Sequence, residues 1–258
     1  MFKPEDFDII DMHVHPFESS NTLLRHFTQT DNMDDFVREM RKAGVKKFAG
    51  SVISLPLRQV DFNEIKRLNR IALQLRDKYP EYIPGIHIHG DYVEESCQEL
   101  HDMKAEGVKF VGELVPYILG TWEYGSDNAL EIFKEAEKLQ MPVNLHGGEE
   151  HELTRVLTTC PNLNIILAHP GETAEAKQRF DFVSRYKNLY MDISGTGLFR
   201  WGMLRYAVDV CGAEKILLGS DMPICSVAMQ VYGVLAENLT REECQKIFAD
   251  NFRYLIGE

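Results

Sequence analysis

Short apolar runs alternate with longer amphipathic stretches from one end of the sequence to the other. Several of the short runs are apolar until their last residue, as expected for β-strands covered on both faces. They lie at residues 8–15, 47–54, 83–89, 108–115, 142–146, 164–169, 189–194 and 216–221. The stretches with helical periodicity lie at residues 32–43, 62–78, 93–105, 126–139, 151–159, 173–186, 199–211 and 240–256. This alternation predicts repeated strand–helix units around a parallel sheet.

Boundary residues support several of these helices. Gly44 and Gly107 stand where glycines end a helix, and Thr240 opens a capping box with Glu243 at its third position. Repeated units of this kind in 258 residues fit a single (β/α)8 TIM barrel, which we expect to form one domain over residues 1–258. The alternative is an open doubly wound sheet, but the sequence has no glycine-rich phosphate loop after the first strand.

The composition is that of a soluble globular protein, and it limits the partners to consider. Hydrophobic residues make up 44% of the sequence and charged residues 26%. No run approaches the ~18 uninterrupted apolar residues of a membrane span. The formal net charge of -12 would repel a polyanion. We therefore expect a small-molecule substrate and neither a nucleic acid nor a membrane, while a homo-oligomer stays open.

The five cysteines indicate a reducing environment. Their number is odd and no two of them form a C-x-x-C pair, so the sequence predicts neither a disulfide framework nor a thiolate zinc site. The first ten residues, MFKPEDFDII, lack the basic segment and the long apolar stretch of a signal peptide. We therefore expect a cytoplasmic protein.

Side chains that can bind a metal stand at or near the carboxyl ends of the predicted strands. In a barrel these ends gather at one face, where such folds carry out their chemistry. The set consists of His13, His15, Glu113, His146, His169 and Asp221, from the first, fourth, fifth, sixth and eighth strands. Imidazole and carboxylate groups ligate divalent ions, and random placement would scatter them over helices and loops. The set as a whole therefore predicts a metal site.

The first strand carries the motif that begins this set. Its sequence FDIIDMHVHP, at residues 7–16, spaces Asp11, His13 and His15 two apart, and residues two apart in a strand point to the same side. The two imidazoles can then hold one ion together. Asp11 lies two residues deeper than His13, so we expect it to orient or support the site rather than to bind the metal.

These motifs resemble the amidohydrolase superfamily of metal-dependent hydrolases, and most closely its amidohydrolase-2 branch. The resemblance rests on D-x-H-x-H in the first strand, the single histidines that close the fifth and sixth strands, and G-S-D-x-P at the eighth. The segment at residues 247–255, with Asn251 and Arg253, is similar to the closing helix of that branch. The resemblance spans nearly the whole chain and implies a TIM barrel with one or two divalent ions. It does not identify the substrate.

The fourth strand offers two candidates for the metal layer. In many binuclear relatives a carbamylated lysine bridges the ions here, whereas Gly112-Glu113-Leu114 is similar to the motif of TatD-type hydrolases, in which a glutamate does so. Lys109 and Glu113 share a face but lie about 13 Å apart along a strand, so only one of them can reach the metals. Glu113 is nearer the carboxyl end and is preferred. The alternative is a salt-bridged carboxylate beside a single ion.

Further polar residues on the strands could contact the substrate. His87 and His89 alternate on the third strand, so both can face the inside of the barrel. Asp192 and Ser194 are spaced in the same way on the seventh strand. The alternative for each pair is a hydrogen-bonded barrel residue that never touches the substrate.

Residues after the strands could complete the pocket. Arg58 and Arg200 are candidate clamps for a carboxylate or phosphate, because a guanidinium group binds both bidentately. Tyr117, Trp122 and Tyr124 follow the fourth strand and could wall the pocket. Solvated loop arginines, and aromatic side chains that merely cover the barrel mouth, are the alternatives.

The predicted site suits the activation of water. Its donor set fits zinc, with manganese or iron as alternatives. A bound divalent ion lowers the pKa of water towards ~7, so hydrolysis of a small-molecule amide, ester or lactone is the leading hypothesis. Asp221 would accept the proton of that water and pass it to the leaving group. His169 would either complete a second metal site with Glu113 or hydrogen-bond the nucleophile and the developing oxyanion.

Three other functions stay open. The resemblance implies decarboxylation as the main alternative, because the same branch contains non-oxidative decarboxylases of aromatic or unsaturated acids. One ordered metal would favour it, with Arg58 or Arg200 holding the acid, and a two-metal site bridged by Glu113 would count against it. A TatD-like phosphodiesterase is suggested by Glu113 and opposed by the net charge. A non-catalytic, metal-stabilised binding protein is disfavoured because no ligand position is degraded.

Overall fold

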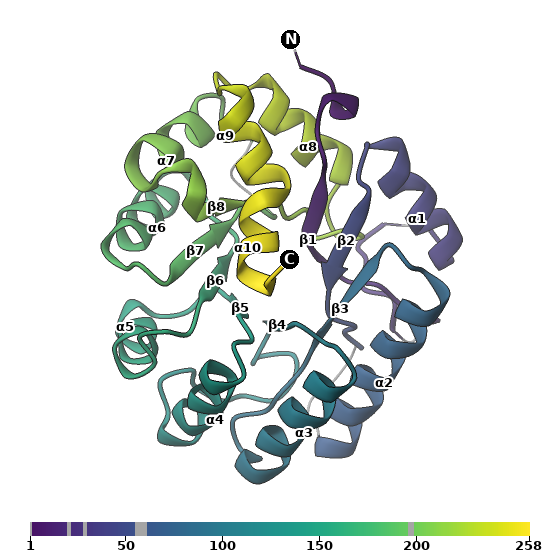
Figure 1. Ribbon diagram of the computed structural model, residues 1–258, viewed down its shortest axis with the longest axis vertical. Coiled ribbons are helices and arrows are strands. Elements are labelled where there is room, and N and C mark those ends of the chain that lie inside the picture. Colours follow the sequence, from purple (N-terminus) through teal and green to yellow (C-terminus); the bar gives the residue numbers. More distant parts are fainter. Residues whose placement is uncertain (1, 20–21, 28–29, 55–60, 196–198) are drawn as a thin grey trace.

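Eight parallel strands form one sheet in which each strand pairs with its neighbours in sequence, from β1 to β8. The computed structural model describes residues 2–19, 22–27, 30–54, 61–195 and 199–258. The strands are β1 Ile10–Val14, β2 Lys47–Gly50, β3 Tyr82–Ile86, β4 Phe110–Leu114, β5 Val143–His146, β6 Ile165–Ala168, β7 Leu189–Asp192 and β8 Ile216–Leu217. A helix on the outside of the sheet joins each strand to the next (Figure 1).

Backbone hydrogen bonds between the first and last strands close this sheet. The amide of Met12 donates to the carbonyl of Leu218 over 2.9 Å, and the amide of Asp221 donates to the carbonyl of His13 over 2.7 Å. The predicted (β/α)8 TIM barrel is therefore confirmed, and the open doubly wound sheet is wrong. The eighth strand is shorter than expected, because the amide of Leu218 bonds to the carbonyl of Ile247 instead of continuing the sheet.

The helices surround the strands, except for the last, α10, which lies across them (Figure 1). They are α1 Met33–Lys42, α2 Phe62–Lys78, α3 Val93–Ala105, α4 Asp127–Lys138, α5 Glu150–Thr159, α6 Thr173–Arg185, α7 Met203–Cys211, α8 Val227–Ala236, α9 Arg241–Gln245 and α10 Asn251–Ile256. Within the described parts of the chain, none of the helices combines the length and apolarity that a membrane span requires.

The end of the chain differs from the prediction in two ways. Helix α8 was not predicted, because it carries no charged residue and its polar Gln230 is itself buried, so its sequence lacks an amphipathic pattern. The helix expected at residues 240–256 is divided into α9, a π-helical turn at Lys246–Asp250, and α10. Its capping box is confirmed, since Thr240 Oγ1 accepts a bond from the amide of Glu243.

Helix α10 closes the end of the barrel where the strands begin. Phe252, Leu255 and Ile256 on this helix are buried in a second hydrophobic cluster, together with the strand residues Ile10, Met12, Ala49, Phe110, Ile166, Tyr190 and Leu217. The rings of Phe110 and Phe252 meet edge to face with their centroids 5.5 Å apart. Figure 1 shows α10 lying across the strands. The opposite end, where the strands finish, is therefore the end left for a functional site.

A buried asparagine fixes α10 to the last strand. Asn251 Nδ2 donates to the carbonyls of Ala213 and Ile216, both over 2.7 Å. Arg253 on the same helix pairs with Asp8, just before β1. These two residues were noted in the sequence as features of a closing helix, and the structure gives each of them an anchoring contact.

We expect Asn251→Ala to lower the free energy of unfolding by about 2–4 kcal/mol, because it leaves two buried carbonyls without a donor. Urea unfolding followed by circular dichroism measures this change. The matched control is Asn238→Ala, the same substitution at an exposed position, which should change stability by less than about 0.5 kcal/mol. Equal effects of the two substitutions would contradict the anchoring role.

Candidate metal centre

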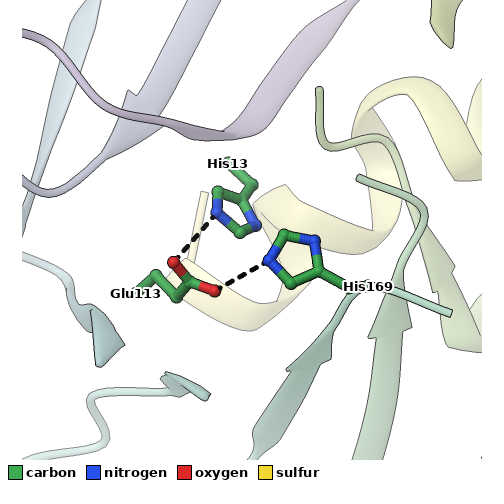
Figure 2. Close-up of side chains that lie close together, drawn as sticks. All are labelled: His13, Glu113 and His169. Atoms are coloured by element: carbon green, nitrogen blue, oxygen red, sulfur yellow. Dashed lines mark ion pairs between the residues drawn. The ribbon is translucent and has the colours of Figure 1, made fainter. Parts of the chain in front are cut away.

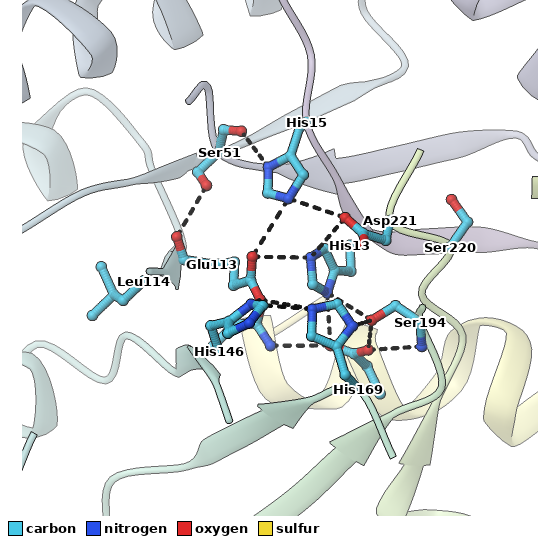
Figure 3. A network of polar contacts seen from close by, with 12 residues as sticks. His13, His15, Ser51, Glu113, Leu114, His146, His169, Ser194, Ser220 and Asp221 are labelled. Atoms are coloured by element: carbon cyan, nitrogen blue, oxygen red, sulfur yellow. Dashed lines mark hydrogen bonds and ion pairs between the residues drawn. The ribbon is translucent and has the colours of Figure 1, made fainter. Parts of the chain in front are cut away.

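Six side chains from five strands meet at the carboxyl ends of the barrel strands (Figure 3). They are the same six that the sequence singled out, namely His13, His15, Glu113, His146, His169 and Asp221. His13 and Glu113 lie within β1 and β4, and His146 ends β5. The other three stand in the turns just beyond β1, β6 and β8. The barrel thus brings together residues that are up to 208 positions apart (221 minus 13).

Glu113 lies at the centre of the cluster and divides it into two parts. Its Oε2 atom lies 3.4 Å from Nε2 of His13 and 3.4 Å from Nε2 of His15. Its Oε1 atom lies 2.7 Å from Nδ1 of His146 and 3.2 Å from Nε2 of His169. Figure 2 shows the carboxylate between His13 and His169, with one oxygen directed towards each. Each oxygen therefore faces a separate pair of imidazoles.

Asp221 completes the first of these two groups. Its Oδ1 atom lies 3.3 Å from Nε2 of His15 and 3.8 Å from Nε2 of His13. In the second group, Nε2 of His169 lies 3.2 Å from Nδ1 of His146. The first group offers two imidazoles and two carboxylates, and the second offers two imidazoles and the shared carboxylate. Both are donor sets that divalent transition metals accept.

The charges of the cluster are strongly coupled. Burial alone would raise the pKa of Glu113, but attraction to His13 and hydrogen bonds from the surrounding imidazoles hold this pKa well below its usual value. Burial alone would lower the pKa of His15, yet hydrogen bonds to Asp221 and Glu113 raise it to about 9. The buried carboxylates thus require positive charge beside them, which an imidazolium or a metal cation can supply.

One buried atom shows that the donor set fits a metal ion. Nε2 of His13 is buried and has no hydrogen-bond partner, although four acidic and imidazole groups, from His15, Glu113, His169 and Asp221, surround it. A buried ring nitrogen without a partner is costly in a folded protein, and a metal ion ligated there would satisfy it. The residues present therefore fit a divalent ion.

Backbone contacts hold the two histidines of the first strand in place. Asp11 Oδ1 accepts bonds from the amides of His13, over 3.2 Å, and Ser220, over 2.9 Å. It thereby ties β1 to the segment before Asp221, and burial raises the pKa of Asp11 to about 7. Nδ1 of His15 lies 3.1 Å from the carbonyl oxygen of Ser51, which sits beyond β2. This agrees with Asp11 as a support rather than a ligand.

Two of the six residues have left-handed backbones. His169 has φ of 62° and Asp221 has φ of 66°, a region that residues other than glycine seldom occupy. Both stand where the chain turns away from a strand, so the unusual conformation re-aims the side chain towards the barrel axis. Gly195, with φ of 68°, lies against the ring of His169, and a Cβ atom there would come within 2.7 Å of Nδ1.

Of the residues predicted to contact the substrate, Tyr117 lies at the edge of the cluster, whereas His87 and His89 bond to the backbone. Tyr117 is mostly exposed, and its hydroxyl lies 3.2 Å from Nε2 of His146 at the edge of the cluster. His87 is buried, with Nε2 lying 2.8 Å from the carbonyl oxygen of Val52. His89 packs against Trp122 and accepts a bond from the amide of Asp91. Of these three residues, only Tyr117 contacts a member of the cluster.

The charged candidates lie outside the cluster or outside the described residues. Arg200 is exposed and pairs with Glu172. Arg58 belongs to residues 55–60, which lie outside the described residues. Lys109, the rival of Glu113, pairs with Glu258 over 2.9 Å beside the closing helix. Of the two fourth-strand candidates, only Glu113 reaches the cluster.

Two contributors escaped the sequence prediction. Asn144 donates from Nδ2 to Asp192 over 3.1 Å inside the barrel, and Ser51 donates from Oγ to the carbonyl of Glu113 over 3.2 Å. Asn144 could have been found, because it stands two residues before His146 in an otherwise apolar strand and so faces the same side. Ser51 also offers its backbone carbonyl oxygen to His15, a contact that leaves no signal in the sequence.

Comparisons with known proteins bear on the family and the fold. The model of the family described as Amidohydrolase, the amidohydrolase-2 group, matches residues 10–255. No curated protein sequence matches the chain. Among solved structures, 2,6-dihydroxybenzoate decarboxylase in complex with 2,6-dihydroxybenzoate is similar with a TM-score of 0.76 at 18% identity, over 96% of this chain and 98% of that chain.

Two further decarboxylases have the same fold. A dihydroxybenzoic acid decarboxylase from Polaromonas sp. JS666, with bound manganese and the inhibitor 2-nitroresorcinol, is similar with a TM-score of 0.75 at 16% identity, over 97% of both chains. 5-Carboxyvanillate decarboxylase from Sphingomonas paucimobilis reaches a TM-score of 0.76 at 12% identity, over 97% of this chain and 99% of that chain. The manganese is a property of that protein, and in this chain the observation that fits a divalent ion is the cluster of histidine and carboxylate groups described above.

We expect Gly195→Ala to weaken divalent-metal binding by about 10–100-fold, because the added methyl group displaces the ring of His169. Calorimetric titration of the metal-free protein measures the change. Gly107→Ala is the matched control, since Gly107 also has a left-handed backbone, with φ of 85°, but an added Cβ meets nothing within 4 Å. Both variants should lose some stability, because alanine is strained in a left-handed backbone. Unchanged metal affinity in Gly195→Ala would contradict metal binding by His169.

Proposed function

Because the chain belongs to the amidohydrolase family, we propose that it is a metal-dependent hydrolase that cleaves an amide, ester or lactone bond of a small molecule at a two-metal centre. The observation that carries this proposal is the position of Glu113. Its two oxygens face separate imidazole pairs at 3.4 Å and at 2.7–3.2 Å, as a carboxylate shared between two ions would. This resembles the glutamate of TatD-type hydrolases, a likeness that stays a prediction.

Each ion has its own set of residues in this proposal. His13, His15 and Asp221 would hold the first ion, His146 and His169 the second, and Glu113 would serve both. Zinc fits these nitrogen and oxygen donors, and the manganese of the Polaromonas decarboxylase makes manganese an equal candidate. When bound, such ions supply Lewis acidity that acidifies water and polarises the oxygen of the scissile bond.

The exposure of the six side chains indicates how a substrate would approach. The side chains of His146 and His169 are 30% and 16% exposed, whereas those of His13 and His15 are 1% and 2% exposed. A substrate would therefore enter over the second pair of histidines. Tyr117 stands on this side and can contact both the substrate and His146.

Asp221 is the residue proposed to move the proton. It is 10% exposed, compared with 2% for Glu113, so it is the carboxylate of the cluster that faces the space where a substrate would lie. It would accept the proton from the attacking water and deliver it to the leaving group. The amides of Ile224 and Cys225 bond to the Asp221 carbonyl and hold this turn in place.

A cytoplasmic location is part of the proposal. The five cysteines are all free, as thiols are in a reducing compartment. The substrate would be a small molecule, as it is in the relatives crystallised with 2,6-dihydroxybenzoate or 2-nitroresorcinol.

We expect the protein to bind two divalent ions per chain and Glu113→Gln to bind less than one under the same conditions, because the amide loses the charge that both ions share. Metal analysis after equilibrium dialysis gives the stoichiometry. Glu99→Gln is the matched control, since Glu99 is also buried but contacts Asn69 in the helical layer rather than the cluster. A wild-type stoichiometry of one ion per chain would contradict the two-metal centre.

We expect Asp221→Asn to lower turnover by about 10²–10⁴-fold at saturating metal, because an amide cannot accept the proton. A screen of lactones, esters and amides would first identify a substrate, and steady-state rates would then be compared at equal metal occupancy. Asp102→Asn, at an exposed position on α3, should leave turnover unchanged. Full activity of Asp221→Asn would rule out the proposed proton transfer.

Non-oxidative decarboxylation of a small carboxylic acid is the second candidate, and the solved structures favour it over hydrolysis. The similar structures include decarboxylases of 2,6-dihydroxybenzoate and 5-carboxyvanillate. The position of Glu113 between two pairs of imidazoles counts against decarboxylation, because it suits two metal ions. Arg200, a candidate for holding the acid, pairs with Glu172 instead. Adding aromatic and unsaturated acids to the screen decides between the two reactions. Release of carbon dioxide with one ion per chain would select the decarboxylase.

A further inference from the structure

We propose that Ser194 is a positioning residue that, together with Asp192, fixes the tautomers of His13 and His169, so that both rings present Nε2 to the metal centre. The inference rests on the proposed function, because it assigns how one ligand of each ion is oriented. It concerns two residues at the end of β7, a strand that contributes no member of the six-residue cluster.

The carboxylate of Asp192 is surrounded by hydrogen-bond donors. Asp192 is fully buried at the end of β7. Its Oδ2 atom lies 3.0 Å from Nδ1 of His13 and accepts a bond from Nδ2 of Asn144 over 3.1 Å. Its Oδ1 atom accepts bonds from the amide of Ser194, over 2.9 Å, and from the hydroxyl of Ser194. Two bonds to each oxygen use the acceptor capacity of an ionised carboxylate.

The hydroxyl of Ser194 has only one hydrogen, and this hydrogen is directed at Asp192. Its oxygen can therefore only accept from its other two neighbours. These are Nδ1 of His169 and Nδ1 of His13, each 3.0 Å away. Nδ1 of His169 must then carry a hydrogen. Nδ1 of His13 faces two acceptors, Asp192 and Ser194, and must carry one as well.

Protonation at Nδ1 leaves the other ring nitrogen available as a ligand. Nε2 of His13 faces Oε2 of Glu113 at 3.4 Å, and Nε2 of His169 faces Oε1 at 3.2 Å. The buried Nε2 of His13, which has no hydrogen-bond partner, is then free to bind a cation. Since the two histidines belong to different groups of the cluster, one Asp–Ser pair orients a ligand of each ion. A bare Nε2 on His169 can ligate an ion but cannot donate a hydrogen bond to a developing oxyanion.

The two histidines depend on Ser194 to different degrees. His13 keeps the carboxylate of Asp192 as an acceptor when the hydroxyl is removed. His169 has the Ser194 oxygen at Nδ1, and the neighbouring Gly195 offers no side chain to replace it. His15 is independent of both, because its Nδ1 lies beside the carbonyl oxygen of Ser51. Loss of the hydroxyl should therefore disturb the second metal group selectively.

Zinc titration of the metal-free protein tests this asymmetry. The weaker of two calorimetric binding events is assigned to the second group, because this group has one carboxylate fewer than the first. In Ser194→Ala we expect this weaker event to weaken by about 10-fold or more and the tighter event by less than about 3-fold. Ser194→Thr retains the hydroxyl and should restore both events. Ser96→Ala is the matched control, because Ser96 is equally buried but bonds to the backbone of His89. Equal weakening of both events in Ser194→Ala would overturn the inference.

Nitrogen-15 NMR of the imidazole side chains provides the second readout, in the full-length protein with and without zinc. We expect His13 and His169 of the wild type to carry hydrogen at Nδ1, and the Nδ1 signal of His169 to shift or broaden in Ser194→Ala. A wild-type His169 with a bare Nδ1 would overturn the inference. A wild type that binds one zinc ion but shows both Nδ1 hydrogens would contradict the two-metal hydrolase and support the positioning role.

Discussion

The burial of one carboxylate among imidazoles is the constraint on which this molecule depends. Glu113 is 2% exposed and has four histidine nitrogens within 3.4 Å. A carboxylate removed from water needs compensating positive charge nearby. The four histidines that surround Glu113 come from β1 and the turn just beyond it, from the end of β5 and from the turn beyond β6. The strands must therefore end at the same level and with the correct residues facing inward. The left-handed backbones at His169 and Asp221 are consistent with this demand.

The two ends of the barrel differ in the side chains that they carry. At the end where the strands begin, α10 covers an apolar cluster, and Lys47 and Lys109 pair with the terminal Glu258. At the other end the same strands finish in imidazoles and carboxylates. Asp11 lies between the two layers and bonds to the backbone on both sides of the β1 and β8 junction. Closure of the barrel at this junction is thus also what brings Asp221 to His15.

The barrel and the six residues of the cluster could be predicted from the sequence, because in a parallel barrel the residues at the carboxyl ends of the strands all lie at one face. Once the strand ends were read from the hydrophobic pattern, the six residues followed, and Glu113 was separated from Lys109 by reach alone. What the sequence could not provide depends on tertiary contacts. The short β8 results from a bond between Leu218 and Ile247, and α8 has no amphipathic signal. Each oxygen of Glu113 faces a different pair of imidazoles, and this arrangement depends on side-chain conformations that the spacing of residues in the sequence does not reveal.

The choice of reaction depends on how this cluster uses its charge. Hydrolysis needs a carboxylate that can take up a proton near the substrate, and the side chain of Asp221 is 10% exposed, compared with 2% for Glu113. Decarboxylation needs positive charge that holds an acid, and in the described residues Arg200 is engaged with Glu172. If Ser194 and Asp192 hold His13 and His169 as proposed, Nε2 of each ring is free to bind the proposed cations. The proposed centre would concentrate positive charge and leave Asp221 as its proton acceptor, which is the arrangement that attack by water requires.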